Sequence, residues 1–228
     1  MKTSMKLSPA VEKRIIRETQ KIFGKSKHYR SEYFRRRIYE TAFHEAGHVV
    51  ARMFTGHDVS HLISVSIIPD GETLGRESSC RNITENVIEG YPDELKQCAG
   101  RILLIGMLAG RAAQLRVAKD EDREGILDCD SEEWDSPGAD LFRVSRISSI
   151  MARPHMPKNR ILQLAEKWTT EMIAIPQVWA ATERIAAALL ERGTITPARV
   201  EKECAEIQHL SFRLPKWMKR LHTLPHTK

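Results

Sequence analysis

The chain has 228 residues, 41% of them hydrophobic, which is long enough to bury a full core. No stretch reaches the roughly eighteen apolar residues that span a bilayer, and the N-terminus lacks a signal-peptide pattern. We therefore expect a cytoplasmic protein without a transmembrane segment. The four cysteines are scattered and form no C-x-x-C pair, so reduced thiols are expected rather than a disulfide framework.

The net charge of +6 is distributed unevenly along the chain. Residues 1–40 carry a net +8, residues 41–210 a net −7 and residues 211–228 a net +5. Basic ends can meet nucleic acid, an anionic membrane surface or an acidic partner, but solvated tails explain them as well and are the favoured interpretation. Aromatic residues make up 6% of the chain, too few for a base-stacking platform, so no nucleic-acid partner is expected.

The N-terminal segment 9–23 places apolar residues among charges and predicts a basic amphipathic helix. A G-K-S tripeptide follows at 24–26. It is not a phosphate-binding loop, because the first glycine of that motif would fall at Thr19 and no strand precedes it. No other ATPase motif is present in this sequence.

The segment 38–54 predicts a helix, and residues 44–48 within it read HEAGH. Four residues are about one helical turn, so His44 and His48 share a face on which two imidazoles can bind one Zn²⁺. Glu45 lies about 100° further round the helix, beside the metal rather than on it, where a general base is expected. The alternative is a helix that carries two solvated histidines.

The middle of the chain predicts a small sheet followed by a core helix. Residues 61–68 alternate in hydrophobicity and predict a strand, and a second strand is expected after Gly75. Segment 92–118 is apolar and rich in small residues, which predicts a central helix with close helix packing. Nine acidic residues between 120 and 135 indicate an exposed loop.

The C-terminal half predicts further helices. One begins after Pro137 and has Asp140 in its first turn, and others are expected at 161–172, 178–191 and 197–207. The predicted fold class is mainly α with a small β-sheet (α+β).

Five segments, in order along the chain, resemble the peptidase domain of the FtsH-type, membrane-anchored AAA+ zinc metalloproteases. They are TAFHEAGHVVARM at 41–53, VSIIPDGETLG at 65–75, LAGRAAQ at 108–114, GADLFRVSRISSIM at 138–151 and IAAALLERGTIT at 185–196. The resemblance covers roughly residues 38–208 and implies a zincin-like helical peptidase domain. The implied organisation is a basic extension (1–37), the peptidase domain (38–210) and a basic tail (211–228).

The resemblance also implies the third metal ligand. In that family it is an aspartate at the start of the helix after a Gly-Ala turn, the position that Asp140 takes here, so the implied Zn²⁺ ligands are His44, His48 and Asp140. Asp135 is the fallback if the loop before Asp140 folds differently. Two histidines, one carboxylate and one open position are what a catalytic zinc site requires.

The implied reaction is hydrolysis of a peptide bond, with Glu45 as general base and later as proton donor to the leaving amine. In the family, an edge strand at the VSIIP position pairs with extended substrate. Val65, Ile67 and Ile68 are therefore candidate substrate contacts, with an ordinary core-packing strand as the alternative.

Three departures from the family pattern stand out. The ATPase module and the membrane helices are absent from this sequence, so the expected substrates are peptides or unfolded proteins, with a separate AAA+ unfoldase as a candidate partner. Gln114 stands where the family usually has a glutamate near the metal. The turn before Asp140 is two residues shorter than usual and follows the acidic insertion 120–135.

The sequence thus predicts a zinc metalloendopeptidase, with a non-catalytic, zinc-stabilised peptide-binding adaptor as the alternative. A nucleic-acid-associated protein that binds through its basic ends is a third, less favoured interpretation. Family members form six-membered rings, so a homo-oligomer and a monomer both stay open.

Overall fold

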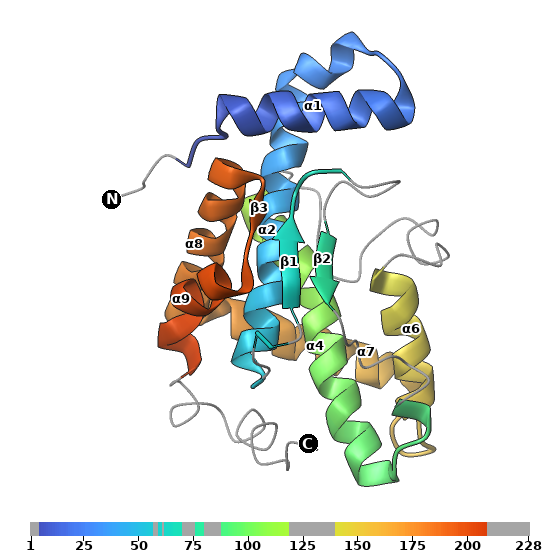
Figure 1. The fold of residues 1–228 in the computed structure, drawn as a ribbon. Helices are drawn as coiled ribbons and strands as arrows, with labels where there is room; N and C mark the ends of the chain where they lie inside the picture. The colour runs from blue at the N-terminus through green and yellow to red at the C-terminus, as the bar shows by residue number, and fades with distance from the viewer. Residues whose placement is uncertain are drawn as a thin grey trace.

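The computed structural model describes residues 5–56, 59–60, 62–69, 76–79, 88–118 and 140–208, with only the backbone at 76–79 and 208. The described part is mainly helical with one small sheet, which confirms the predicted fold class at that level (Figure 1). In chain order its elements are α1 (Pro9–Phe23), η1 (Lys27–Arg30, a 3₁₀ helix), α2 (Glu32–Phe54), β1 (Leu62–Ser66), β2 (Arg76–Ser79), α4 (Asp93–Val117), α6 (Asp140–Met151), α7 (Lys158–Ala174), α8 (Pro176–Arg192), β3 (Thr194–Ile195) and α9 (Pro197–Gln208).

Helix α2 runs through the middle of the molecule and carries the HEAGH segment (Figure 1). It begins six residues before the predicted start at residue 38, because the Ser31 hydroxyl caps it by accepting a hydrogen bond from the Phe34 N–H at 3.1 Å. The predicted boundary between the N-terminal extension and the peptidase domain, at 37/38, therefore falls inside one continuous helix.

Helices α2 and α4 approach each other closely at Gly47. A Cβ atom at this position would overlap the carbonyl oxygen of Ala109 on α4. Only glycine therefore lets the two backbones come together here, and that approach brings α4 against the histidines of α2.

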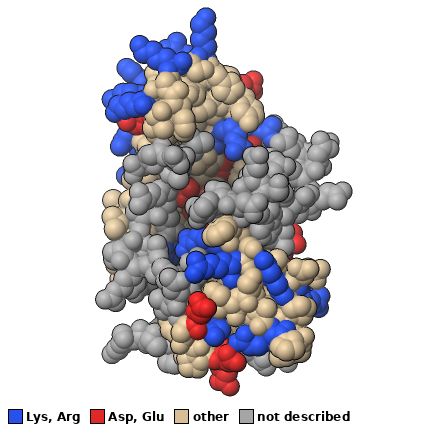
Figure 2. Space-filling view, turned by 90° about the vertical axis from the view of Figure 1, so that its right-hand side faces the viewer, with Lys and Arg blue, Asp and Glu red and all other residues tan. Residues whose placement is uncertain are grey.

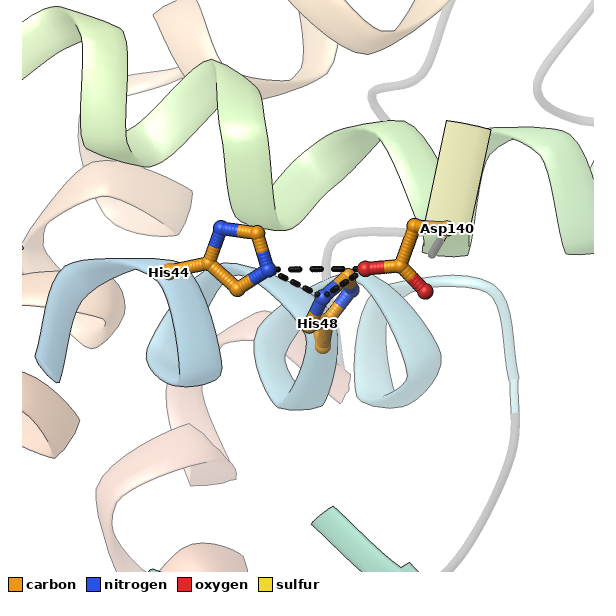
Figure 3. Close-up of side chains that lie close together, drawn as sticks. All are labelled: His44, His48 and Asp140. Carbon is orange, nitrogen blue, oxygen red and sulfur yellow. Dashed lines mark hydrogen bonds and ion pairs between the residues drawn. The ribbon is translucent and has the colours of Figure 1, made fainter. Parts of the chain in front are cut away.

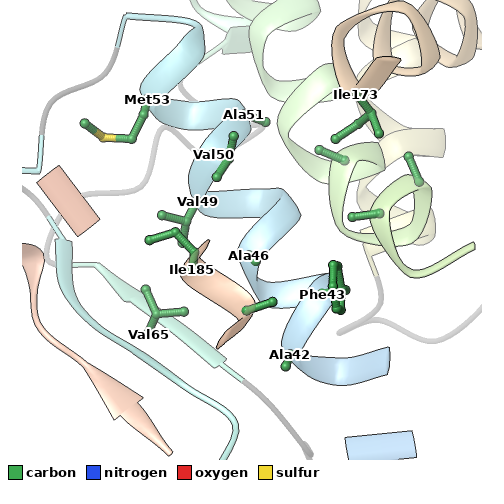
Figure 4. Close-up of a cluster of buried hydrophobic side chains, with 14 of the residues drawn as sticks. Ala42, Phe43, Ala46, Val49, Val50, Ala51, Met53, Val65, Ile173 and Ile185 are labelled. Carbon is green, nitrogen blue, oxygen red and sulfur yellow. The ribbon is translucent and has the colours of Figure 1, made fainter. Parts of the chain in front are cut away.

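A single hydrophobic cluster fills the space between the helices (Figure 4). Phe43 and Val50 of α2, Leu108 of α4 and Ile185 of α8 are all at most 1% exposed. Ile15 of α1 belongs to the same cluster, so the N-terminal helix packs onto the core rather than standing apart from it.

Strand β1 is the central strand of the sheet. The strand order is β2-β1-β3, and both neighbours pair with β1 in antiparallel fashion. Next to this pairing, the Ile67 N–H donates to the Gly193 carbonyl at 2.8 Å. The expectation that this segment forms an edge strand is wrong, because the short strand β3, which the sequence analysis missed, covers its second side.

Among the described helices, α4 is the one that is long and apolar enough to cross a membrane by length and composition. Half of its most apolar window is buried inside the protein. This burial is that of a core helix, the role predicted for segment 92–118.

Candidate metal centre

His44, His48 and Asp140 come together at one point between α2 and the first residue of α6 (Figure 3). The Nε2 atoms of His44 and His48 are 3.0 Å apart. The Oδ2 atom of Asp140 lies 2.9 Å from Nε2 of His48 and 3.4 Å from Nε2 of His44. Within the described residues these three side chains form the one group of three or more that could hold a metal ion.

The other ring nitrogen of each histidine is bound to α4. The Nδ1 of His48 lies 2.8 Å from the carbonyl oxygen of Gly106, which can only accept a hydrogen bond, so this nitrogen carries the proton. The Nδ1 of His44 lies 3.1 Å from Oε1 of Gln114 and donates to it in the same way. With both Nδ1 atoms protonated, the Nε2 atoms of both rings face the same point, and each offers a lone pair there when its ring is neutral.

This arrangement could hold either a shared proton or a metal ion. Two lone pairs 3.0 Å apart, with a carboxylate oxygen beside them, repel one another unless a proton or a metal ion lies between them. In a tetrahedral zinc site with bonds of about 2.0–2.1 Å, neighbouring ligand atoms are about 3.3 Å apart. The three observed separations, 2.9 Å, 3.0 Å and 3.4 Å, lie close to that value, so the donor set fits Zn²⁺.

Asp140 and His48 form an ion pair in the site, and the side chains around it are partly exposed. Burial opposes ionisation of Asp140, but the charge of His48 and hydrogen bonds from both histidines hold the pKa of this carboxyl far below its usual range. Burial alone would lower the pKa of His48, yet the charge and hydrogen bond of Asp140 raise it to about 9. The side chains of His44 and Asp140 remain 27% and 31% exposed, which leaves room for water to reach the site.

Glu45 lies next to His44 in α2 and is only 7% exposed. Burial raises the pKa of its carboxyl; the nearby His44 and His48 oppose this, while the charge of Asp140 adds to it. A carboxylate with a raised pKa beside a candidate metal centre is suited to take up and release a proton.

One face of α4 shapes the site, and its residues are spaced four apart: Gly106, Gly110 and Gln114. Gly106 contributes its carbonyl oxygen, and Gln114 its side-chain oxygen. A Cβ at Gly110 would overlap the imidazole of His48, so the absence of a side chain there makes room for that ring. The small residues of segment 92–118 and Gln114 are visible in the sequence, and their shared spacing of four residues was a usable signal for this face.

Other predicted site residues lie elsewhere. Val65, Ile67 and Ile68 are 0%, 1% and 8% exposed, so their side chains belong to the core and do not present a surface to a substrate. Asp135 and the acidic insertion 120–135 lie outside the described residues, as does the Gly-Ala turn at 138–139.

No protein-family model matches this sequence, and no curated protein matches it either. The resemblance to FtsH-type peptidases therefore rests on the sequence segments quoted above.

Proposed function

We propose that this protein is a zinc-dependent metalloendopeptidase of zincin-like, FtsH type that hydrolyses peptide bonds of unfolded proteins or peptides. The observation that carries the proposal is the convergence of His44 Nε2, His48 Nε2 and Asp140 Oδ2, with both imidazoles fixed in the metal-binding tautomer by α4. A metal site alone can be purely structural, whereas a hydrolase also needs a general base. The buried Glu45 beside the three ligands supplies that base.

The three converging atoms would hold the Zn²⁺ ion, which is not itself part of the structure. When bound, zinc supplies Lewis-acid activation of a water molecule and stabilises negative charge on the scissile carbonyl oxygen. The protein orients the two imidazole rings. Gln114 accepts a hydrogen bond from His44, Gly106 accepts one from His48, and Gly110 leaves space for the ring of His48.

Glu45 moves the proton. Its carboxylate would accept a proton from the attacking water and then donate it to the nitrogen of the leaving amine. Burial raises the pKa of Glu45 toward the working pH, which favours both transfers, because the group must gain and lose the same proton in one cycle.

The substrate is proposed to bind as an extended chain that adds to the sheet. β1 has a partner strand on both sides at Val65 and Ser66, and within the described residues the outer side of β2 has no partner strand. Pairing there would recognise the peptide backbone more than its side chains, which suits unfolded substrates. A separate AAA+ unfoldase remains the proposed source of such substrates, and the cytoplasm the proposed location.

The test compares the wild-type chain with Glu45→Gln for zinc content and for cleavage of unfolded casein. We expect one zinc per chain in both proteins and a loss of cleavage of at least about a hundredfold in Glu45→Gln. Glu191→Gln, an exposed carboxylate on α8, is the matched control and should cleave like the wild type.

Two outcomes would contradict the proposal. Full activity of Glu45→Gln would remove the assigned base. Stoichiometric zinc with no cleavage by the wild type would instead support the zinc-stabilised peptide-binding adaptor.

A further inference from the structure

Exposed apolar side chains gather at one end of the molecule. Ile22 and Phe23, at the end of α1, are 36% and 58% exposed, and Tyr33, at the start of α2, is 60% exposed. Of the described large hydrophobic residues, only Ile63 is comparably exposed. Between Phe23 and Tyr33 along the chain, the ring of His28 in η1 lies 5.5 Å from that of Tyr33. We call residues 21–33 the N-terminal tip.

The N-terminal tip is also strongly basic. The tip, residues 21–33, has four basic residues, Lys21, Lys25, Lys27 and Arg30, against one acidic residue, Glu32. Lys21 pairs with Glu18 at 2.7 Å, while the other three form no ion pair with any residue that the structure describes. Figure 2 shows Lys and Arg side chains gathered at this end of the molecule. Positive charge and apolar surface thus occupy the same place.

The tip is built on packed structure rather than on a loose segment. The opposite face of α1 buries Val11 and Ile15 in the core, and Phe34 is 6% exposed. Glu12 of α1 pairs with Arg35 of α2 at 2.6 Å, which joins the two helices beneath the tip. None of the tip residues 21–33 is buried, so their exposed apolar side chains are not part of the core.

We propose that the N-terminal tip is a docking surface for an anionic phospholipid bilayer. Aromatic and aliphatic side chains insert at the boundary between headgroups and acyl chains, and neighbouring Lys and Arg side chains contact anionic headgroups. A protruding end suits a flat surface (Figure 1). Phe23 and Tyr33 can also stack on bases, whereas the aliphatic Ile22 suits an acyl chain only, so the experiment below includes nucleic acid as the competing occupant.

Docking would place the candidate metal centre near the bilayer. His44 lies twelve residues along α2 from Glu32, about 18 Å at the rise of an α-helix.

The experiment is co-sedimentation of the full chain with vesicles of phosphatidylcholine alone or with about 30% phosphatidylserine. We expect binding to the anionic vesicles only, weakening as salt is added. The triple variant Lys25→Gln/Lys27→Gln/Arg30→Gln should bind about a hundredfold more weakly. Each basic residue near an anionic surface contributes about 1 kcal/mol of binding free energy, and three such residues are lost. Phe23→Ser/Tyr33→Ser should bind more weakly even at low salt, since it removes the inserted side chains.

The matched control removes the same charge from α7 and α9. Arg160, Lys167 and Lys202 are exposed, and their joint replacement by Gln should leave binding within about twofold of the wild type, because distant charges are screened. Circular dichroism of each variant checks the fold.

Four results would overturn the proposal: no binding by the wild type, equal binding to neutral vesicles, equal loss in both triple variants, or binding to nucleic acid in preference to vesicles. Cleavage of casein in solution, without vesicles, tests the proposed function independently of membrane docking. The tip variants should retain the wild-type rate, and an inactive wild type that still binds anionic vesicles would leave the docking surface intact.

Discussion

The two halves of α2 differ in how they are held, although they form one continuous helix. The first half has one exposed face and one buried face: Tyr33 is exposed, while the buried Glu40 pairs with Arg36 at 2.9 Å and with Arg37 at 3.1 Å. The second half, from residue 42 to residue 54, faces α4, where Gly47 meets the α4 backbone. The exposed positions of the first half should therefore tolerate substitution, whereas the positions that face α4 in the second half should not.

The largest effect is expected at Gly47. In Gly47→Ala the new Cβ overlaps the Ala109 carbonyl, so α2 and α4 must separate, and we expect the free energy of unfolding to fall by about 2–3 kcal/mol. Urea unfolding measures this loss. Gly106→Ala is the control, because a Cβ there meets nothing within 4 Å and replacing a glycine inside a helix should stabilise the protein by about 0.5–1 kcal/mol. Equal stability of Gly47→Ala and the wild type would show that the helices do not approach this closely.

Gly106→Ala also serves as the control for a second prediction, which concerns zinc affinity. Gly110→Ala places a methyl group against the His48 ring and should weaken zinc binding by up to about a hundredfold, the upper range for disturbed support of a metal ligand. Gly106→Ala lies one turn away and keeps the carbonyl that binds Nδ1 of His48, so its zinc affinity should match the wild type. Competition with a chromophoric chelator measures both. Similar affinities in the two variants would contradict the position assigned to His48.

A smaller loss is expected at Gln114. Gln114→Leu removes the acceptor for Nδ1 of His44, which frees the ring to rotate, and zinc affinity should fall about tenfold. Gln114→Glu keeps an acceptor and should restore zinc binding to at least the wild-type level. If the leucine and glutamate variants bind zinc equally, the contact between Gln114 and His44 has no role in holding the metal.

The smallest effect is expected in the first half of α2. Tyr33→Ser should change the free energy of unfolding by no more than about 0.5 kcal/mol, because the ring is largely solvated. Thermal and urea unfolding measure it. A loss comparable to that in Gly47→Ala would mean that the two halves of the helix do not differ.

Much of the helical framework was predictable, because it depends on local patterns. The predicted bounds of α1 agree with the structure, and α4 differs by one residue at each end. The start of α2 was missed because three consecutive arginines, 35–37, hide the apolar period, so the cap at Ser31 was not recognised.

Only those site residues that lie close together in the sequence could be predicted from their pattern. His44, Glu45 and His48 lie within one turn of helix, so their spacing was sufficient to group them. Asp140 came from the family resemblance, and the structure brings it to the two histidines. The contacts of Gly106 and Gln114 depend on how α4 packs on α2, and the central position of β1 depends on β3, about 130 residues later in the chain. Such tertiary relations leave little trace in a single sequence.

The central claim is that His44, His48 and Asp140 bind one zinc ion. X-ray absorption at the zinc edge of the purified, zinc-loaded chain tests it most directly, because it reports the type and number of ligand atoms. We predict one zinc per chain, bound by nitrogen and oxygen atoms at about 2.0–2.1 Å with two imidazoles and no sulfur. A chain that binds no zinc, or zinc bound by cysteine sulfur at about 2.3 Å, would contradict the assignment.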